Sequence, residues 1–309
     1  MTFKRIKALQ TTPEPKFRSG FISIVGRPNV GKSTLLNALV GEKVAIVSPK
    51  PQTTRNRIIG IRNAPDHQLV FIDTPGIHKP RTRLGEFMDQ SIKDALEAID
   101  MLIVMVDATK VTPQDHEAVK LTSSLNIPRF LLLNKLDLVR PQDLLPLIAS
   151  FADDSFDMIL PISAKNGEGL NTLMAEIVKR LPEGPQYFPE EQWTDQTERQ
   201  IIAELIREQA LYLLSEEIPH GIGVEILSMK EETPELTEIF ADIYCERASH
   251  KGIIIGKHGA MLVKIGSRAR AQIESLLNTH INLKLWVKVR PDWRNSPSDL
   301  RTLGYTEKT

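Results

Sequence analysis

The stretch Gly26-Arg27-Pro28-Asn29-Val30-Gly31-Lys32-Ser33 decides the fold of the first half of the chain. It follows the apolar run 21–25 and leads into a helix-like stretch at 34–40. Its glycines allow successive backbone N–H groups to wrap around phosphates, its lysine can reach the outer phosphate oxygens, and its serine hydroxyl can bind Mg²⁺. The helix beginning at Lys32 adds the positive end of its dipole. The motif predicts a phosphate-binding loop; taken alone, it also fits a glycine-rich turn without a ligand.

The length and composition of the chain limit what else can be expected. With 309 residues the chain predicts two domains, and 41% hydrophobic residues suffice for buried cores. The single cysteine, Cys245, excludes an internal disulfide and a multi-cysteine metal site, which is typical of a reducing compartment. Residues 1–18 lack a continuous apolar stretch, and no later run is long enough to cross a bilayer. We therefore expect a cytosolic protein with a short disordered arm.

Charge is segregated along the chain, although the formal net charge is zero. Residues 182–242 hold fifteen acidic residues and three basic ones, Arg199, Arg207 and Lys230. Residues 247–290 reverse the balance, with nine lysines or arginines and the single acidic residue Glu274. A solvated face usually mixes the two signs more evenly. We therefore expect an anionic partner for the last third of the chain.

The first half alternates short apolar runs with helix-length amphipathic stretches. The runs are continuous and are joined by helices, so a mostly parallel sheet covered on both faces is predicted. Ligands of such sheets bind at the carboxyl ends of the strands, where the loop at Gly26 lies. The predicted strands are 44–47, 57–61, 68–72, 101–106, 130–133 and 158–162, and the predicted helices are 86–99, 113–125, 141–151 and 171–180.

Three further motifs each directly follow a predicted strand: Asp73-Thr74-Pro75-Gly76, Asn134-Lys135-Leu136-Asp137 and Ser163-Ala164-Lys165. Asp73 can hold an Mg²⁺-bound water, and the Gly76 N–H can point at a γ-phosphate. Asp137 can accept hydrogen bonds from both donors of the guanine edge, Lys135 can lie along the base, and the Ala164 N–H can meet the guanine carbonyl. Adenine presents the opposite pattern and should be rejected strongly. Each motif could be a chance turn, but in this order they predict a guanine-nucleotide site.

With these motifs the first domain resembles GTPases of the translation-factor-related class. The segment Pro51-Gln52-Thr53-Thr54-Arg55-Asn56-Arg57 resembles their switch region, whose threonine binds Mg²⁺ in the triphosphate state. Thr53 and Thr54 both compete for that role, and the spacing to the arginines favours Thr54. The resemblance implies GTP or GDP and Mg²⁺ as ligands, with Ser33, Thr54 and Asp73 at the metal and Lys32, Thr54 and Gly76 in catalysis. The expected nucleotide-binding residues are Gly26, Arg27, Pro28, Asn29, Val30, Gly31, Lys32, Ser33, Thr34, Asp73, Thr74, Pro75, Gly76, Asn134, Lys135, Asp137, Ser163, Ala164 and Lys165.

The residue that follows Gly76 is Ile77, where many signalling GTPases carry the glutamine that orients the attacking water. Isoleucine has no group for that task, so backbone groups, another side chain, an ion or a partner must position the water. Unassisted turnover should therefore be slow. Related GTPases with an asparagine at the position of Asn29 are often activated by potassium, which makes K⁺ a further expected ion. As an alternative, Asn29 is an ordinary polar loop residue.

A second domain follows a linker. Three prolines and a glycine within residues 182–189 mark this linker. Thr197 and Gln200 have capping-box spacing ahead of a helix with an apolar stripe. Strands are expected at 222–227, 237–245 and 282–289, with a helix at 260–277. We therefore divide the chain into an N-terminal arm (1–19), a GTPase domain (20–181), a linker (182–195) and a second domain with a C-terminal tail (196–309).

The stretch Gly252-Ile253-Ile254-Ile255-Gly256-Lys257-His258-Gly259-Ala260-Met261 carries the second functional signal. Gly256 and Gly259 let a nucleic-acid backbone approach the following helix, and the isoleucines flank a groove for unstacked bases. The pattern indicates a KH-type RNA clamp, and the basic segment favours RNA; a glycine turn that starts a helix is the alternative. His258 is expected to hydrogen-bond within the loop. The predicted RNA-binding residues are Ile255, Gly256, Lys257, His258, Gly259, Lys264 and Arg268.

Both motif sets, with the endings Leu285-Trp286-Val287-Lys288-Val289 and Leu300-Arg301-Thr302-Leu303-Gly304-Tyr305, resemble the Era family of GTPases from about residue 20 to 305. The resemblance implies an α/β P-loop GTPase domain followed by an α+β type II KH domain. It also implies a cytoplasmic, bacterial ribosome-assembly GTPase that binds the 3′ end of small-subunit ribosomal RNA and the small subunit, with some association with the inner membrane. We expect a monomer.

Two alternatives from other functional classes stay open. One is a non-catalytic RNA-binding scaffold that only holds GDP, because Ile77 cannot orient water. The other is a GTPase that serves tRNA modification. Such relatives carry cofactor-binding or catalytic additions, and the sequence has no segment of that kind.

Overall fold

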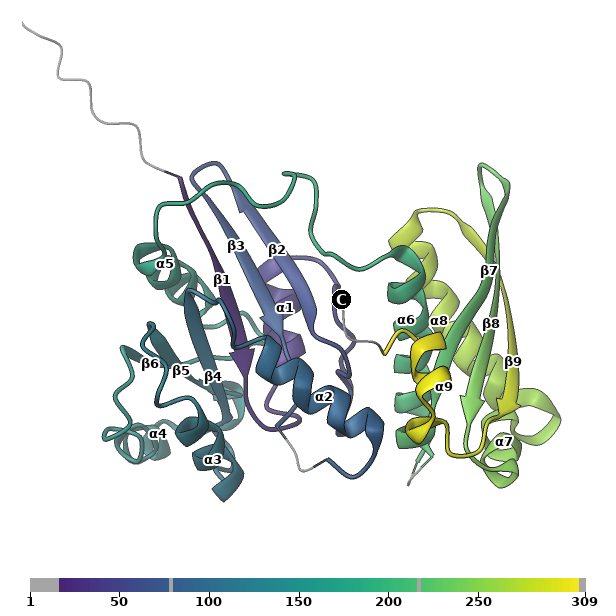
Figure 1. The fold of residues 1–309 in the computed structure, drawn as a ribbon, viewed down its shortest axis with the longest axis horizontal. Coiled ribbons are helices and arrows are strands. Elements are labelled where there is room, and N and C mark those ends of the chain that lie inside the picture. The colour runs from purple at the N-terminus through teal and green to yellow at the C-terminus, as the bar shows by residue number, and fades with distance from the viewer. Residues whose placement is uncertain (1–16, 78–79, 216–217, 306–309) are drawn as a thin grey trace, which may run out of the picture.

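The computed structural model describes residues 17–77, 80–215 and 218–305. These residues form two sheets, each with its own helices (Figure 1). The predicted disordered arm lies outside the described residues except for its last positions, and the first strand already begins at Arg18. No helix in the described ranges has the length and apolar character needed to cross a membrane.

The first sheet has six strands in the order β2-β3-β1-β4-β5-β6. All neighbouring pairs are parallel except β2 and β3, which are antiparallel. Every residue of β4 and β5 is buried, which explains their continuous apolar sequences. The strands are β1 (Arg18–Val25), β2 (Ile58–Ala64), β3 (His67–Asp73), β4 (Met101–Asp107), β5 (Arg129–Asn134) and β6 (Met158–Pro161).

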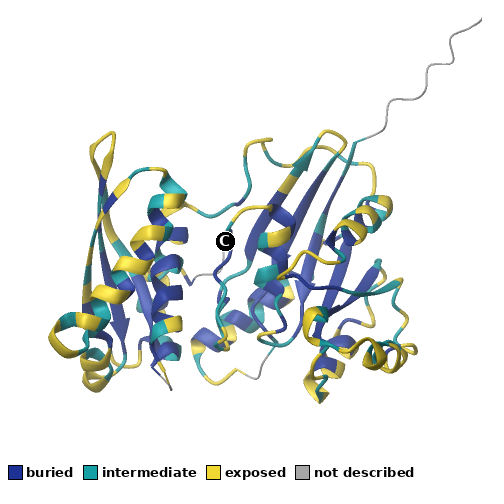
Figure 2. Cartoon of the chain, turned by 180° about the vertical axis from the view of Figure 1, so that it is seen from behind, coloured by how far each residue is buried: buried dark blue, intermediate teal, exposed yellow. Residues whose placement is uncertain are grey.

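Helices cover both faces of this sheet. Apolar residues of α1 (Lys32–Val40) and α5 (Leu170–Arg180) form one core with the strands, and Val119 of α3 (Pro113–Leu121) belongs to the core on the other face. The buried strands lie between these layers in Figure 2. The remaining helices of this half are α2 (Arg83–Asp94) and α4 (Pro141–Ala149). The predicted P-loop architecture is therefore confirmed.

The prediction of a strand at 44–47 is wrong. This segment is a loop whose amides bond to side chains: Val44 and Ala45 donate to Asn37 Oδ1 (3.0 and 2.9 Å), and Val47 donates to Glu208 Oε1 (2.9 Å). Ile46 packs into the core of the second half. The apolar pattern thus reflects burial between the two halves of the chain, with no neighbouring strand involved.

The second sheet has the order β7-β8-β9, with β7 (Gly223–Thr233) antiparallel and β9 (His280–Val289) parallel to β8 (Leu236–Cys245). Two helices, α6 (Glu198–Leu213) and α8 (Ala260–Leu277), pack against it and share its apolar core. Thr197 and Gln200 form the expected capping box at the start of α6. The sequence analysis assigns no element to α7 (Ala248–Ile255), which precedes the Gly256–Gly259 turn. This arrangement is a KH fold, as predicted.

The connection between the two sheets runs along the edge strand β2. The Ile61 N–H donates to the Trp193 carbonyl (2.9 Å), and the Thr194 hydroxyl donates to the Ile59 carbonyl (2.7 Å). Trp193 packs against the cores of both halves. The connection therefore satisfies an otherwise open sheet edge as well as joining the halves.

The end of the described chain returns to the first half. Helix α9 (Pro297–Thr302) is yellow in Figure 1, and the chain runs on from it toward the first half. Trp293, Leu300 and Tyr305 form a buried apolar cluster with Leu84 and Met88 of α2. This cluster joins the two halves of the chain.

Candidate functional site

The phosphate-loop motif lies between β1 and α1, as the sequence predicts. Gly31 precedes α1 with φ of 106°, and no side chain caps the first amides of this helix. These amides are positioned to face an anion. Lys32 Nζ donates to the carbonyls of Gly26 (3.0 Å) and Arg27 (3.1 Å). Burial lowers the pKa of Lys32 from 10.5 to about 8, although Asp73 opposes the shift.

Three side chains predicted to hold Mg²⁺ meet beside this loop. Ser33 Oγ lies 2.7 Å from Asp73 Oδ2 and 2.9 Å from Thr54 Oγ1. Thr54 Oγ1 also lies 3.2 Å from Asp73 Oδ2. The Thr53 hydroxyl is not part of this group and donates instead to the Lys50 carbonyl (2.6 Å). The structure therefore brings Thr54, and not Thr53, to the other two residues.

The surroundings of Asp73 fit a bound cation. The residue is fully buried, and its Oδ1 atom has no hydrogen-bond partner within the described part of the chain. Burial raises the pKa of this carboxyl, while Lys32 and the hydroxyls of Ser33 and Thr54 act in the opposite direction. A divalent cation would compensate the buried charge. Carboxylate and hydroxyl oxygens are suitable ligands for Mg²⁺.

The motif after β3 packs directly on the phosphate loop. Thr74 Oγ1 donates to the Ile24 carbonyl (2.8 Å), and the Ile77 N–H donates to the Gly26 carbonyl (3.2 Å). A Cβ on Gly76 would lie 2.7 Å from the backbone nitrogen of Pro28. Only glycine allows this close approach, so Gly76 is needed for the motif to pack against the loop.

The predicted base-recognition motifs also converge. Asn134 Nδ2 donates to the Val30 carbonyl (2.7 Å), which ties the motif to the phosphate loop. Ser163 Oγ donates to Asp137 Oδ1 (2.7 Å). The Ala164 N–H donates to Asn134 Oδ1 (2.9 Å), so a guanine carbonyl would share this amide. Its contact with guanine stays a prediction.

The sequence analysis missed a polar group at the end of β4. Asp107 Oδ2 accepts from Lys135 Nζ (2.6 Å) and lies 3.6 Å from Arg27 Nη2. Burial opposes ionisation of this carboxyl, but hydrogen bonds from Lys135 and Thr109 lower its pKa overall. Asp115 holds Arg27 from the other side through two 3.0 Å contacts. The available signal was that Asp107 follows a buried strand, just as Asp73 and Asn134 do.

A cavity of about 590 Å³ lies at the phosphate loop and the segment that carries Thr54, and Lys135 lines it from the predicted base-recognition motifs. Its size is in the range of small-molecule sites. One of its walls is Tyr212 of α6, which the sequence analysis did not associate with the nucleotide. The other lining residues are Pro28, Asn29, Gly31, Lys32, Ser33, Thr34, Ile46, Val47, Ser48, Pro49, Gln52, Thr53, Thr54, Gly76 and Lys135.

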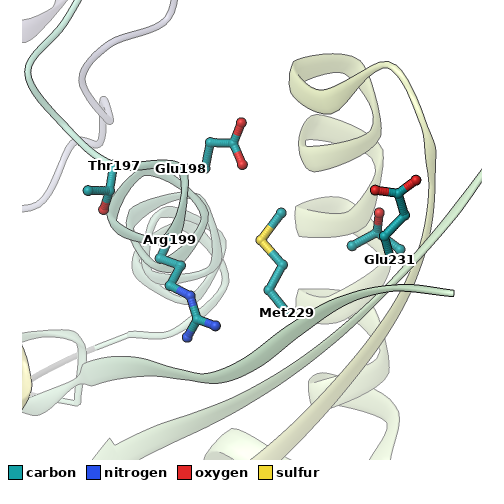
Figure 3. A pocket seen from close by; sticks show the side chains of 6 residues that line it. Thr197, Glu198, Arg199, Met229 and Glu231 are labelled. Atoms are coloured by element: carbon teal, nitrogen blue, oxygen red, sulfur yellow. The ribbon is translucent and has the colours of Figure 1, made fainter. Parts of the chain in front are cut away.

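A second concavity, of about 430 Å³, lies between α6 and the β7–β8 hairpin. The charged ends of Glu198, Arg199 and Glu231 point in different directions and do not converge on one point (Figure 3). None of its lining residues belongs to a predicted nucleotide-binding or RNA-binding motif. We therefore assign it no ligand.

The Gly256–Gly259 turn joins α7 to α8. Gly256 has φ of 72° and Gly259 has φ of 80°, and His258 between them also has a positive φ of 52°. A Cβ on Gly256 would lie 2.7 Å from Cβ of Met261, whereas none of the described atoms lies within 4 Å of a Cβ on Gly259. Gly256 is thus needed for packing, and Gly259 for its backbone conformation and an open surface. Lys257 and His258 are exposed at the tip.

Ion pairs divide the basic residues of the last third into two groups. On the sheet, Lys284 pairs with Glu238 and Lys288 pairs with Asp242, both at 2.6 Å. Lys257, Lys264 and Arg268 are exposed and have no ion pair among the described residues. The charge segregation seen in the sequence is therefore partly cancelled across β8 and β9, and unpaired positive charge remains around the glycine turn and on α8.

Two family models match parts of the two halves of the chain. A family model described as a 50S ribosome-binding GTPase matches residues 21–135, and a KH-domain model matches residues 217–294. The chain is 51% identical over 291 residues to GTPase Era of Ruminiclostridium cellulolyticum, covering 94% of this chain and 98% of that protein. It is 50% identical over 296 residues to GTPase Era of Clostridioides difficile, covering 94% and 100%.

Solved structures extend this similarity to the arrangement of the whole chain. Era in complex with MgGDPNP and nucleotides 1506–1542 of 16S ribosomal RNA superposes with a TM-score of 0.91 and 42% identity, covering 94% of this chain and all of that one. An Era variant of Aquifex aeolicus bound to GDP·AlF4⁻ gives the same TM-score and identity.

Proposed function

This chain belongs to the Era family of GTPases, and from that premise we propose that it is a nucleotide-dependent RNA-binding switch acting in small ribosomal subunit assembly. GTP hydrolysis follows from membership of the family. The observation that carries the proposal is the convergence of Ser33, Thr54 and Asp73 beside an uncapped helix N-terminus. A solved relative with MgGDPNP and ribosomal RNA supports both ligands.

We assign the nucleotide to the 590 Å³ cavity. Lys32 and the first amides of α1 bind its phosphates, and Asp137 and Lys135 bind its base. Ser33, Thr54 and Asp73 would hold Mg²⁺, which when bound neutralises charge on the β- and γ-phosphates. The other residues of the four motifs complete the assignment: Gly26 to Thr34, Asp73 to Gly76, Asn134 and Ser163 to Lys165.

The attacking water has no side chain at Ile77 to orient it. We propose that the Gly76 N–H contacts the γ-phosphate and that Asn29 contributes to a K⁺ site. Asn29 Nδ2 donates to the Pro49 carbonyl (2.9 Å), so the other atom of this amide, Oδ1, is the oxygen left to bind an ion. Oxygen atoms of this kind are the ligands that hard cations such as K⁺ prefer.

We assign RNA binding to the turn between α7 and α8. Lys257, His258, Lys264 and Arg268 are exposed there, and Ile255 and Gly256 line its start. The exposed polar groups can bind RNA phosphates, and the apolar Ile255 can contact unstacked bases. The 16S ribosomal RNA fragment bound to a solved Era suggests the 3′ end of small-subunit ribosomal RNA as the ligand here.

We propose the domain limits 20–181 and 196–309 with a linker at 182–195; two sheets and two cores support this division, although β1 begins at Arg18, two residues before the first limit. Binding to the small subunit itself, a monomeric state, and a cytoplasmic location with peripheral inner-membrane association rest on the family resemblance alone.

The test of function is phosphate release from GTP by the purified chain. Lys32→Ala should lower the rate about 100-fold or more, because it removes the only lysine of the loop that faces the phosphates. Lys179→Ala, an exposed lysine on α5, serves as the matched control and should keep the parental rate. A parental rate equal to that of Lys32→Ala would indicate a scaffold that only holds nucleotide.

A further inference from the structure

Two consecutive residues of the switch segment send their side chains into different halves of the chain. The Thr54 hydroxyl lies at Asp73 and Ser33. The Arg55 side chain is 2% exposed and lies among groups of the second half. Its Nη1 atom donates to the Ile222 carbonyl (2.6 Å) and to the Tyr305 hydroxyl (3.2 Å), and Nη2 donates to the His220 carbonyl (3.0 Å).

The aromatic partners of Arg55 come from the last described residues of the chain. Its guanidinium carbon lies 5.6 Å from the ring centre of Trp293 and 5.9 Å from that of Tyr305. We call residues 293–305 the C-terminal socket. Almost all of it lies beyond the KH-domain match, which ends at residue 294. The socket is therefore an addition to the RNA-binding fold.

The same socket also contacts the helix that follows the Asp73–Gly76 motif. Leu84 and Met88 of α2 are buried with Trp293 and Tyr305, and the Arg83 N–H donates to Asn295 Oδ1 (3.1 Å). The segment that carries Thr54 and the helix that follows the Asp73–Gly76 motif thus both contact residues 293–305.

Helix α6 holds the loop that leads to Thr54. Glu208 accepts from the Val47 N–H (2.9 Å) and from Lys43 Nζ (2.6 Å). Arg207 Nη2 donates to the Thr53 carbonyl. The loop from Lys43 to Arg55 is therefore attached to the second half at both ends.

Burying Arg55 costs free energy, and burial lowers its pKa, although Tyr305 opposes the shift. Its Nε atom has no hydrogen-bond partner in the described residues. A buried cation held by carbonyl oxygens and aromatic rings contributes little net stability but fixes geometry, because any displacement leaves it unpaired. A fixed guanidinium of this kind can also fix the position of the next residue in the chain, Thr54.

We propose that Arg55 is a positioning residue for Thr54, and that the C-terminal socket, through Arg55, holds the Thr54 hydroxyl at the metal site of the triphosphate state. The inference rests on the proposed role of Thr54 in binding Mg²⁺. According to this inference, the metal site for GTP is complete only when the second half of the chain is packed against the first. The Arg55 guanidinium is the group that connects the two.

The test compares the affinities of the full chain for GDP and for a non-hydrolysable GTP analogue, both with Mg²⁺, by titration calorimetry. Arg55→Met keeps the length of the side chain but removes its charge and donors. It should lower the affinity for the analogue at least tenfold and the affinity for GDP less than twofold, because Thr54 contacts the metal only in the triphosphate state. It should also raise the Mg²⁺ concentration needed for analogue binding. Arg270→Met removes an exposed arginine of α8, outside the socket, and should change neither affinity.

Tyr305→Phe removes one acceptor of Arg55 and should give a smaller loss in the same direction, about two- to fivefold. Because the two residues share a hydrogen bond, the double variant should lose less than the product of the single losses. If Arg55→Met does not fold, Tyr305→Phe decides. A loss of affinity for the analogue but not for GDP supports the inference, and unchanged affinities overturn it.

Equal weakening of both nucleotides by Arg55→Met, or no weakening, would overturn the inference, because Arg55 would then be structural only. Failure of the proposed function has a different signature. In that case the parental chain itself would bind the analogue without Mg²⁺ dependence or release no phosphate.

Discussion

Ser33 and Asp73 are hydrogen-bonded at 2.7 Å although 40 residues of chain separate them. Ser33 lies in the first turn of α1, and Asp73 ends β3. The parallel pairing of β1 with β3 places Ile24 opposite Asp73, which brings the end of β3 to the start of the phosphate loop. The distance therefore results from strand register. Together with Thr54, these two residues would hold Mg²⁺, which would neutralise phosphate charge beside them.

The first prediction concerns pH. The pKa of Lys32 is about 8 in the described structure, and nucleotide phosphates should raise it by favouring the charged form. Below pH 8 the lysine is already protonated, so GTP affinity should be nearly constant. Above pH 8 binding must take up a proton, so affinity should fall up to tenfold per pH unit until the bound-state pKa is reached. Calorimetry between pH 7 and 9.5, in buffers of different ionisation enthalpy, measures both effects, and a flat profile would contradict them.

The second prediction concerns base specificity. Asp137→Asn should weaken GTP binding about 100-fold or more, because two hydrogen bonds to a charged acceptor are lost. The same variant should favour xanthosine triphosphate, whose edge offers an acceptor in place of one guanine donor. Asp143→Asn, an exposed carboxylate paired only with Arg140 among the described residues, is the control. GTP binding by Asp137→Asn at the parental level would remove Asp137 from base recognition.

The third prediction concerns rate and potassium. Without a water-orienting side chain at Ile77, the purified chain should hydrolyse GTP at roughly 10⁻⁴ to 10⁻² per second. Replacing K⁺ with Na⁺ should slow the parental chain but not Asn29→Ala, if Asn29 helps to bind the ion. Single-turnover hydrolysis in the two salts measures this, and equal parental rates would exclude K⁺ from the mechanism.

The fourth prediction concerns RNA. Changing Lys257 and His258 together to aspartate should weaken single-stranded RNA binding at least 100-fold, because charge at the glycine turn is reversed. Nucleotide affinity should stay within about twofold. The matched control changes His116 and Lys120, both exposed on α3, to aspartate. Fluorescence anisotropy at several salt concentrations compares the three proteins, and equal loss in both variants would mean that only net charge matters.

The fifth prediction concerns coupling between the two sites. If GTP tightens RNA binding by some factor, RNA must tighten GTP binding by the same factor. For a nucleotide-dependent switch, we expect RNA affinity to differ between the states with a non-hydrolysable GTP analogue, with GDP and without nucleotide. Three identical affinities would instead describe two tethered modules without a switch.

Sequence patterns were sufficient to predict a site wherever its function needs residues that are close together in the chain. The Gly26–Ser33 loop and the Gly256–Gly259 turn depend on backbone conformations that glycine allows, so each motif carries its own geometry. The continuous apolar strands likewise indicate a sheet covered on both faces, because full burial requires it. Fold class and nucleotide class are therefore readable without coordinates.

Tertiary structure decided what depends on distant partners. The apolar residues 44–47 suggest a strand, yet Asn37 and Glu208 satisfy their amides and the second core covers Ile46. Arg55 looks like an ordinary switch arginine, but its partners include the carbonyl of Ile222 and the hydroxyl of Tyr305. Local propensity cannot specify such contacts, because they arise only when two separately patterned domains pack together and bury the groups between them.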